Sequence, residues 1–388
     1  MSMNGPFLTR TEHRSIGGKL SEISWGLVLT VTLIACVGFG ILYSVSGSFD
    51  PWADRQMVRF GFGLLLMTAV ALTSLKVWFQ SVYVFYGVAL VLLVVVEAFG
   101  RIGMGAQRWI DLGFIQIQPS EVMKLALVLA LARYYHDRTL EEARQFRHMI
   151  IPVFLILLPA GLVIHQPDLG TGLLIIMGGT AMLFLGGVKA RWFIGTGLAG
   201  LVSVPVAWKV LTRYDILYQH QMNRILTFLH PEDDPLGAGY HIMQSKIALG
   251  SGGIHGKGFM QGTQAHLNFL PEKQTDFIFT MLGEEFGLIG GLVLLALYSI
   301  VFAYGIVIAM QCRHTFGRLV ALGVTVTFFL YVFINIAMVM GLLPVVGVPL
   351  PLVSYGGTAM MTLMIGLGFL LNVRIHRDAS LSRADTIE

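Results

Sequence analysis

Apolar residues form long, nearly uninterrupted runs along this chain, and polar residues concentrate in the stretches between them. A helix needs ~20 apolar residues to cross a bilayer, whereas a helix of a soluble protein shows only an apolar stripe. The pattern therefore predicts one helical membrane domain over residues 23–373. Its ten predicted spans are residues 23–43, 57–74, 78–98, 119–135, 149–165, 169–188, 192–211, 277–310, 319–343 and 358–373.

The polar stretches divide into two short ends and two unusual loops. Residues 1–22 and 374–388 form the ends, and the loops are 99–118 and the long segment 212–276. A long structureless loop is uncommon in a compact domain, and residues 241–249 repeat apolar positions at helical spacing. We expect short interfacial helices in this long loop. The eighth span is longer than a bilayer requires, which suggests a tilted or projecting helix.

Composition agrees with a polytopic membrane protein. Hydrophobic residues make up 55% of the chain and charged residues 12%, against roughly 25% charged in soluble domains. Cys36 and Cys312 are too few and too far apart for a disulfide framework or a thiolate metal site. The first apolar run is long and no small-residue cleavage pattern follows it, so we expect a retained span.

Lys and Arg residues in the short loops predict the orientation, because such loops retain positive charge on the cytoplasmic side. If both termini are cytoplasmic, the inner side holds 15 Lys and Arg residues and the short outer loops hold 4. This distribution explains much of the net charge of +4 without nucleic acid as a partner. The predicted fold class is an all-α polytopic membrane protein with ten transmembrane helices, both termini cytoplasmic, and a long periplasmic loop between spans seven and eight.

The fourth span opens with charged residues, in the motif Gln118-Pro-Ser-Glu-Val-Met-Lys124. Glu121 and Lys124 are three residues apart, so they share a helix face and can pair. Helix capping explains Ser120, but it does not explain a Lys one turn inside an apolar helix, which is costly without a partner. We favour a functional or architectural ion pair over a plain cap.

Two further outer segments carry candidate polar groups. Asp168, between the fifth and sixth spans, is equally well interpreted as a helix cap and as a site carboxylate. The Gly-rich segment 250–258 matches neither a P-loop nor a dinucleotide fingerprint. Its glycines permit close backbone approach and its amides can hold anions. Four basic residues could therefore meet a pyrophosphate, although solvated surface positions explain each of them at least as well: Arg108, Arg224, Lys246 and Lys257.

Two segments are expected to border an outer cavity. Prolines keep residues 344–357 from forming regular helix, and irregular backbone at membrane depth needs protein or a wet cavity around it. Ser354 is a candidate polar contact there. Asp276 lies where the loop 212–276 enters the eighth span, either as a helix cap, with Thr275 competing for that position, or as a chemical group.

Several of these motifs together resemble the SEDS family of shape, elongation, division and sporulation proteins. The resemblance covers nearly the whole chain, and within the family it is closer to the elongation member than to the division member. The motifs are Gln118-Pro-Ser-Glu-Val-Met-Lys124, Gln166-Pro-Asp-Leu-Gly-Thr171, Gly239-Tyr-His, Gln244-Ser, Gly262-Thr-Gln, Leu270-Pro-Glu-Lys-Gln-Thr-Asp-Phe277, Gly283-Glu-Glu and Pro349-Leu-Pro-Leu-Val-Ser-Tyr-Gly-Gly357.

The resemblance implies a glycosyltransferase of the bacterial inner membrane that polymerises lipid II into β-1,4 glycan strands at the periplasmic face. Asp276 matches the family's proposed catalytic base, with Glu121 and Lys124 shaping the cavity or its field, and Asp168 as a secondary group. Arg108, Lys246 and Lys257 are candidates for the pyrophosphate. The metal requirement is open, and Mg²⁺ or Mn²⁺ are the candidate ions.

Implied partners are membrane lipid, a class B penicillin-binding protein that crosslinks the strands, and other proteins of the elongation complex. Three alternatives stay open: a division-specific polymerase, a lipid II flippase and a scaffold of the wall-synthesis complex. A flippase should carry charged groups deep in several helices, whereas the candidate groups here gather near the outer face.

Overall fold

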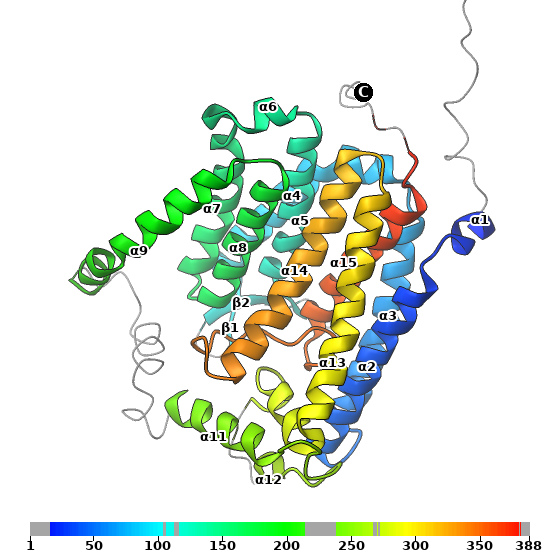
Figure 1. Cartoon of the computed structure of the whole chain (residues 1–388), viewed down its shortest axis with the longest axis vertical. Coiled ribbons are helices and arrows are strands. Elements are labelled where there is room, and N and C mark those ends of the chain that lie inside the picture. Colours follow the sequence, from blue (N-terminus) through cyan, green and yellow to red (C-terminus); the bar gives the residue numbers. More distant parts are fainter. Residues whose placement is uncertain are drawn as a thin grey trace, which may run out of the picture.

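The fold is a helical bundle whose long helices follow the predicted apolar runs (Figure 1). The computed structural model describes residues 16–103, 106–111, 116–213, 238–266, 270, 272–379 and 381. The helices that correspond to the ten predicted spans are α2 (Trp25–Ser46), α3 (Ala53–Leu72), α4 (Leu75–Phe99), α5 (Pro119–His136), α7 (Ile150–His165), α8 (Leu169–Leu185), α9 (Ala190–Arg213), α13 (Ile278–Gln311), α14 (Thr315–Val339) and α15 (Gly357–Ile375).

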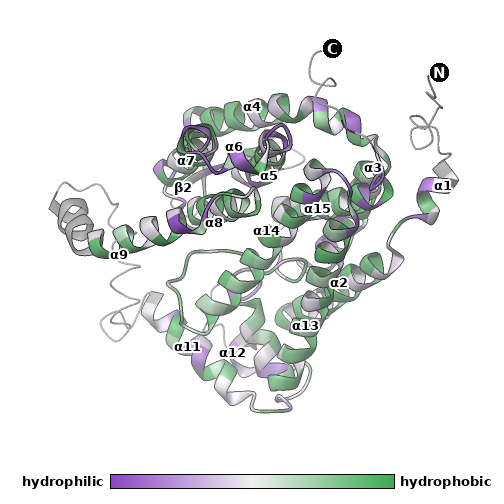
Figure 2. Cartoon of the chain, turned by 45° about the horizontal axis from the view of Figure 1, so that its top comes forward, coloured by the Kyte–Doolittle hydropathy of each residue, from purple (hydrophilic) through white to green (hydrophobic). Residues whose placement is uncertain are grey.

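Seven helices of the described residues are long and apolar enough to cross a membrane, so the chain is a multi-pass membrane protein. They are α2, α3, α4, α7 together with the turn before it (Phe146–His165), α13, α14 and α15. Of the other three, α8 is apolar but has only 17 residues, and α5 carries several charged residues along its length. Figure 2 shows the hydrophobic colouring that runs along most of the bundle.

Helix α5 lies at the centre of the bundle, which explains how it tolerates charge. It packs against α4, α8 and α14, and nearly every side chain from Pro119 to Tyr135 is buried. Because protein surrounds α5, its polar groups face other side chains instead of lipid. A charged residue inside a membrane domain is normally found in such a position.

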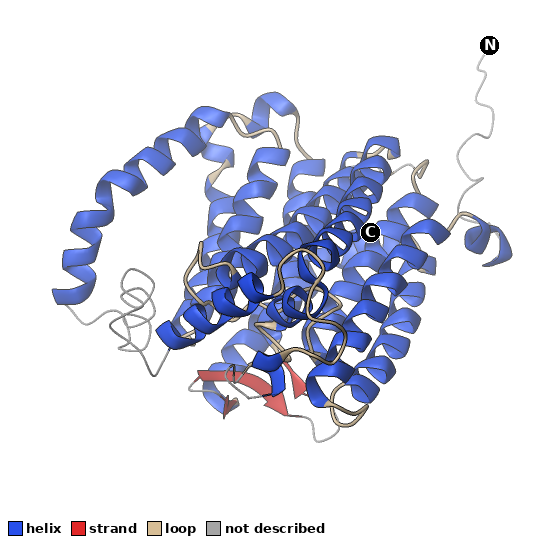
Figure 3. Ribbon diagram, turned by 60° about the horizontal axis from the view of Figure 1, so that its bottom comes forward, coloured by secondary structure: helices blue, strands red, loops and turns tan. Residues whose placement is uncertain are grey.

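The described part of the loop between α4 and α5 forms a small sheet, which the all-α prediction did not include. Strands β1 (Arg101–Gly103), β2 (Ala106–Asp111) and β3 (Gln116–Ile117) pair antiparallel in that order. The strands contain Ile102, Trp109, Ile110 and Ile117, whose residue types favour strands over helices. The all-α prediction therefore needs this addition, and Figure 3 shows the strands at one end of the bundle.

The expectation of helices in the long loop is confirmed for the part that the structure describes. Helices α11 (Ala238–Ser251) and α12 (Thr263–His266) form there. Residues 214–237, which include Arg224, lie outside the described residues.

The length of α13 is explained by a kink at Gly287, where φ is 63° and ψ is −159°. The Gly-rich segment 250–258 packs against this kink, and Leu288 N donates to Gly253 O over 2.9 Å. A Cβ atom on Gly256 would lie 2.1 Å from the Glu285 carbonyl oxygen. The glycines therefore serve close backbone packing. The amides of Lys257 and Gly258 bond to carbonyls of α13, so they are not available to cradle a phosphate.

The two ends of the bundle differ in what they hold. Helices α1 (Ile16–Ser21) and α6 (Leu140–Ala143), the 3₁₀ turn η1 (Phe146–His148) and the end of α15 lie at one end. The sheet, α11 and α12 lie at the other (Figure 1). Among the described residues, these two groups of segments thus lie at opposite ends of the bundle.

Candidate active site

A cavity of about 500 Å³ opens at the end of the bundle that carries the sheet. Its walls come from the β2–β3 region, the starts of α5, α8 and α15, the turn before α13, and the irregular segment before α15. The expectation that residues 344–357 border a cavity is thus confirmed. The cavity brings together five of the predicted site residues: Arg108, Glu121, Lys124, Asp168 and Asp276.

The predicted pair of Glu121 and Lys124 forms, and a tyrosine completes it. Lys124 Nζ lies 2.6 Å from Glu121 Oε1, and Tyr331 Oη donates to Glu121 Oε2 over 2.5 Å. Lys124 also donates to the Tyr331 hydroxyl and lies 4.4 Å from the centre of its ring. Only 4% of each charged residue is exposed. A buried ion pair is tolerated when further hydrogen bonds satisfy both charges, and Tyr331 supplies them here.

Asp168 combines the two interpretations that its sequence position allows. Its Oδ1 accepts a hydrogen bond from Thr171 N at 3.2 Å, so it caps α8. Its Oδ2 lies 3.5 Å from Arg108 Nε on the cavity wall. Arg108 also donates from Nη2 to Pro167 O over 2.7 Å. These contacts hold the Arg108 guanidinium, which comes from strand β2, at the start of α8. Asp168 is its counter-charge.

The turn that carries Asp276 is fixed by its backbone. Asn335 Nδ2 donates to the Asp276 carbonyl over 3.0 Å and to the Val348 carbonyl over 2.7 Å. Asn335 is fully buried on α14. A Cβ atom on Gly347, whose φ is +71°, would lie 3.4 Å from Asp276 Oδ2. The irregular segment before α15 therefore packs directly against the Asp276 carboxylate.

The N-cap position of α13 is occupied by Phe277, and not by Asp276 or Thr275. Thr275 instead donates from its hydroxyl to Glu272 Oε2 over 3.0 Å. Glu272 and Asp276 both line the cavity. Glu272 was not predicted as a site residue. Its position four residues before Asp276 was the feature of the sequence that could have indicated a second carboxylate near the proposed site.

Three predicted site residues lie outside the cavity walls. Ser354 is buried, donates to Thr275 O over 2.6 Å and accepts from Leu350 N over 2.7 Å, so it holds the cavity segment against the Asp276 turn. Lys257 lies 2.6 Å from the buried Glu284 and 2.9 Å from Thr263 Oγ1. Lys246 is exposed on α11, with its ammonium group packed near Gly341.

Arg59 on α3 is a cation at the cavity rim that sequence analysis counted only for orientation. Its guanidinium carbon lies 4.5 Å from the centre of the Tyr355 ring, and Tyr355 lines the cavity. Its Nη1 atom is buried and has no hydrogen-bond partner among the described residues. The signal was an Arg three residues inside a predicted span, where a charge is normally functional.

The family model described as "Cell cycle protein", which covers FtsW, RodA and SpoVE, matches residues 23–379. The chain belongs to this family. It is 44% identical over 338 residues to the peptidoglycan glycosyltransferase MrdB of Escherichia coli, covering 87% of this chain and 89% of MrdB. Proteins named as probable FtsW match at 34% identity.

Two solved structures resemble the fold. One comes from a study of polymerization and crosslinking by a peptidoglycan synthase complex; its matching chain has a TM-score of 0.78 and 33% identity over 92% of this chain and 98% of that one. The other is the rod shape determining protein RodA of Thermus thermophilus, with a TM-score of 0.69 and 29% identity over 92% of this chain and 98% of that one.

Proposed function

We propose that this family member is a peptidoglycan glycosyltransferase that extends glycan strands from lipid II during cell elongation. The observation that carries the proposal is the cavity in which the Asp276 carboxylate shares one chamber with the buried Glu121–Lys124 pair. The higher identity to MrdB than to FtsW proteins favours the elongation role over the division role.

The proposed topology has ten transmembrane helices in the bacterial inner membrane with both termini cytoplasmic. It rests on the Lys and Arg distribution and on the arrangement in Figure 1, where the ends of the bundle separate the predicted inner and outer segments. In this orientation the cavity opens toward the periplasm. It would lie at the depth where the diphosphate of a membrane-anchored substrate meets water.

Asp276 is proposed as the general base. A β-1,4 bond made from an α-linked sugar diphosphate inverts the anomeric carbon, so one displacement suffices. The acceptor hydroxyl must lose its proton as its oxygen attacks, and a carboxylate within hydrogen-bond reach can take that proton. The backbone bonds from Asn335 and the packing of Gly347 would keep this carboxylate in place.

The leaving diphosphate needs positive charge around it. Arg108 lies in the cavity wall and Arg59 at its rim, so these two are the proposed contacts. Asp168 would orient Arg108, and the Glu121–Lys124 pair would shape the cavity and its field. Lys246 and Lys257 remain proposed substrate contacts only for parts of the substrate beyond the cavity walls. Ser354 is buried and its hydroxyl is engaged by backbone groups, so its proposed part is to hold the cavity segment against the Asp276 turn.

A divalent cation fits as an ion that arrives with the diphosphate. Mg²⁺ commonly binds through one or two carboxylates together with substrate phosphates. Glu272 and Asp276 are the carboxylates that would hold it, and it would neutralise the leaving group. The described residues contain no group of three or more metal-binding side chains that could hold a metal ion.

The proposed partners are a class B penicillin-binding protein, which would crosslink the new strands, other elongation-complex proteins and the surrounding lipid. Support comes from the match to a chain of a peptidoglycan synthase complex.

The proposal is tested with purified protein and its partner, whose transpeptidase is inactivated, given labelled lipid II. A polymerase yields glycan strands from this mixture. A flippase would move lipid II across vesicles without product, and a scaffold would do neither, so absence of glycan product contradicts the proposal.

A further inference from the structure

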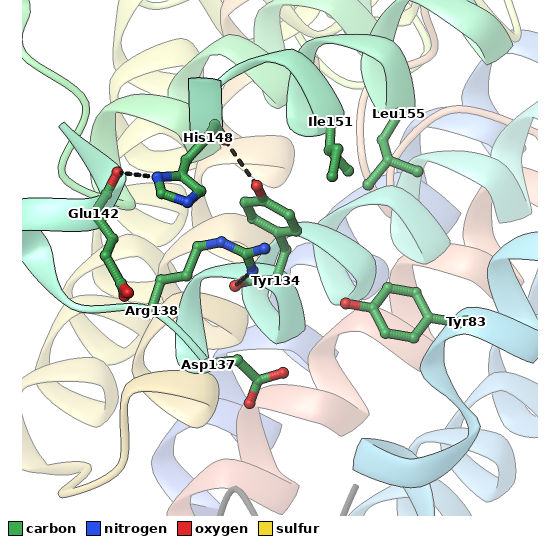
Figure 4. Close-up of a pocket in the computed structure, with 8 residues that line it drawn as sticks. All are labelled: Tyr83, Tyr134, Asp137, Arg138, Glu142, His148, Ile151 and Leu155. Carbon is green, nitrogen blue, oxygen red and sulfur yellow. Dashed lines mark hydrogen bonds between the residues drawn. The ribbon is translucent and has the colours of Figure 1, made fainter. Parts of the chain in front are cut away.

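A second cavity, of about 560 Å³, opens at the opposite end of the bundle from the proposed catalytic cavity. It lies between the start of α4, the end of α5 and the start of α7 (Figure 4). None of its lining residues has a part in the proposed transferase chemistry. Its walls combine charged, aromatic and apolar side chains in one chamber.

The polar end of this cavity offers an acceptor and a cation on consecutive residues. Asp137 follows the last turn of α5, and its Oδ2 atom lies 3.5 Å from Arg133 Nε. Its Oδ1 atom is buried and accepts no hydrogen bond among the described residues. Arg138 lies 3.5 Å above the centre of the Tyr134 ring and donates from Nη1 to Tyr134 O over 2.9 Å. A guanidinium has five N–H donors, so most of its donor capacity is open to a ligand.

The rim of the cavity is built before any ligand arrives. Tyr134 Oη donates to His148 O over 2.8 Å, and His148 Nδ1 lies 3.0 Å from Glu142 O. The Glu142 carboxylate accepts from Thr139 N over 2.8 Å as part of a capping box. These bonds tie α5, α6 and η1 together, and they engage the Glu142 carboxylate. Asp137 Oδ1 is then the carboxylate oxygen proposed to accept from a ligand.

The other end of the cavity is apolar. Ile151 and Leu155 lie one turn apart on α7, and Tyr83 faces them from α4 (Figure 4). Ile151 is 52% exposed and Tyr83 is 47% exposed. Both residues belong to helices that are apolar enough to cross a membrane, so this side of the cavity opens toward lipid.

We propose that this cavity binds an aminophospholipid. The phosphate would meet Arg138, the primary ammonium would donate to Asp137 Oδ1, and the upper part of an acyl chain would lie along Ile151 and Leu155. Charge-assisted bonds of this kind are the strong ones. A choline headgroup has no N–H to donate to Asp137 Oδ1, and a glycerol headgroup has no ammonium group to place there. A soluble ligand would leave the apolar wall unused.

Native mass spectrometry of the full chain in detergent tests this directly. The probes are phosphatidylethanolamine, phosphatidylcholine and phosphatidylglycerol with identical acyl chains, each titrated separately. We expect one phosphatidylethanolamine molecule to bind at a saturable site. It should bind about tenfold more tightly than either of the other two lipids, because it makes one additional charge-assisted hydrogen bond. Equal retention of all three lipids would overturn the proposal.

Two variants separate the two headgroup contacts. Asp137→Asn should abolish the preference for ethanolamine over choline, and Arg138→Gln should weaken both lipids by about tenfold. Glu141→Gln and Arg144→Gln are the matched controls, because they remove the same charges from exposed positions of the same loop. If a control changes the lipid preference as much as the corresponding site variant does, the effect comes from the overall charge of this region. That result would refute the site.

A third variant covers the case in which a charge change disturbs folding. Ile151→Trp fills the apolar end from an exposed position, and it should lower ethanolamine-lipid binding while the thermal midpoint in detergent alone stays unchanged. Unaltered binding in this variant contradicts the assignment. Displacement of the lipid by equimolar glycerophosphoethanolamine would show a soluble ligand as the occupant, and displacement by a polybasic peptide would show a protein; either result overturns the lipid assignment.

Discussion

The side-chain amide of Asn335 donates to the Asp276 carbonyl over 3.0 Å and, from the same nitrogen, to the Val348 carbonyl over 2.7 Å. One buried residue of α14 therefore holds both the turn with the proposed base and the segment that packs against its carboxylate. Both acceptors lie in irregular backbone, where no helix supplies a hydrogen-bond donor. The fold thus fixes the position of the Asp276 carboxylate.

Asn335→Ala should lower the turnover number for glycan synthesis about tenfold or more, because a small misplacement of a catalytic group is costly. Two buried carbonyls lose their donor, so the free energy of unfolding should fall by about 1–3 kcal/mol. Asn372→Ala is the control, since Asn372 bonds three backbone carbonyls at the distant end of α3. It should cost similar stability with near-normal turnover per folded molecule; equal turnover losses would contradict the positioning role.

The Glu121–Lys124–Tyr331 cluster predicts strong coupling between its members. Lys124→Met leaves Glu121 buried without its cation, which should destabilise the protein by about 3–5 kcal/mol. Lys124→Met with Glu121→Gln should recover part of this loss, because no charge is then left buried alone. Thermal or denaturant unfolding of the four proteins of this cycle measures the coupling. Additive effects would show that the pair does not act as one unit.

Arg59 is expected to act on substrate affinity. Arg59→Gln should raise the KM for lipid II about tenfold with a smaller change in turnover, since the residue lies at the rim and not beside Asp276. Arg55→Gln, an exposed cation on the same helix, is the control. The prediction fails if Arg59→Gln changes only the free energy of unfolding and leaves the KM as in the wild type.

His314, in the turn between α13 and α14, predicts a pH effect on stability. Burial lowers the pKa of His314 to about 4, and its Nδ1 accepts from Gly317 N as the cap of α14. In the unfolded chain a His has a pKa near 6.5. Between about pH 4 and about pH 6.5, His314 therefore binds a proton in the unfolded chain but not in the folded protein. Stability should therefore fall as pH drops from about 6.5 toward 4.

The variant for this effect is His314→Asn, because Asn is a strong cap without a titrating group. Its thermal midpoint should depend less on pH over this range than that of the wild type. The exposed His255→Gln serves as the comparison. An identical pH slope in wild type and His314→Asn would rule out His314 as its source.

Much of the bundle followed from sequence because the bilayer dictates length and apolarity, so that each predicted span corresponds to a helix. The Glu121–Lys124 pair was predictable because it lies within one helix and has fixed spacing. Tyr331 and Asn335 were not, since each acts across a separation of many residues that only tertiary packing closes.

Other misses have local physical causes. Strands β1, β2 and β3 were not predicted, although their Ile and Trp residues favour strands. The Gly-rich segment suggested an anion cradle, but close approach to the kink at Gly287 is what its glycines serve. Glycines in a sequence indicate that a segment can approach another backbone closely. Which backbone it approaches is known only from the folded structure.

The most direct test of the account is glycan synthesis by Asp276→Asn, which keeps the size and the backbone contacts of the residue and removes the base. The variant, purified with its transpeptidase-inactive partner and given labelled lipid II, should insert and assemble normally and make no glycan product. Glu272→Gln, which changes the neighbouring cavity carboxylate, should retain measurable polymerisation. Wild-type yield from Asp276→Asn, or loss of product only in Glu272→Gln, would contradict the assignment of Asp276 as the base.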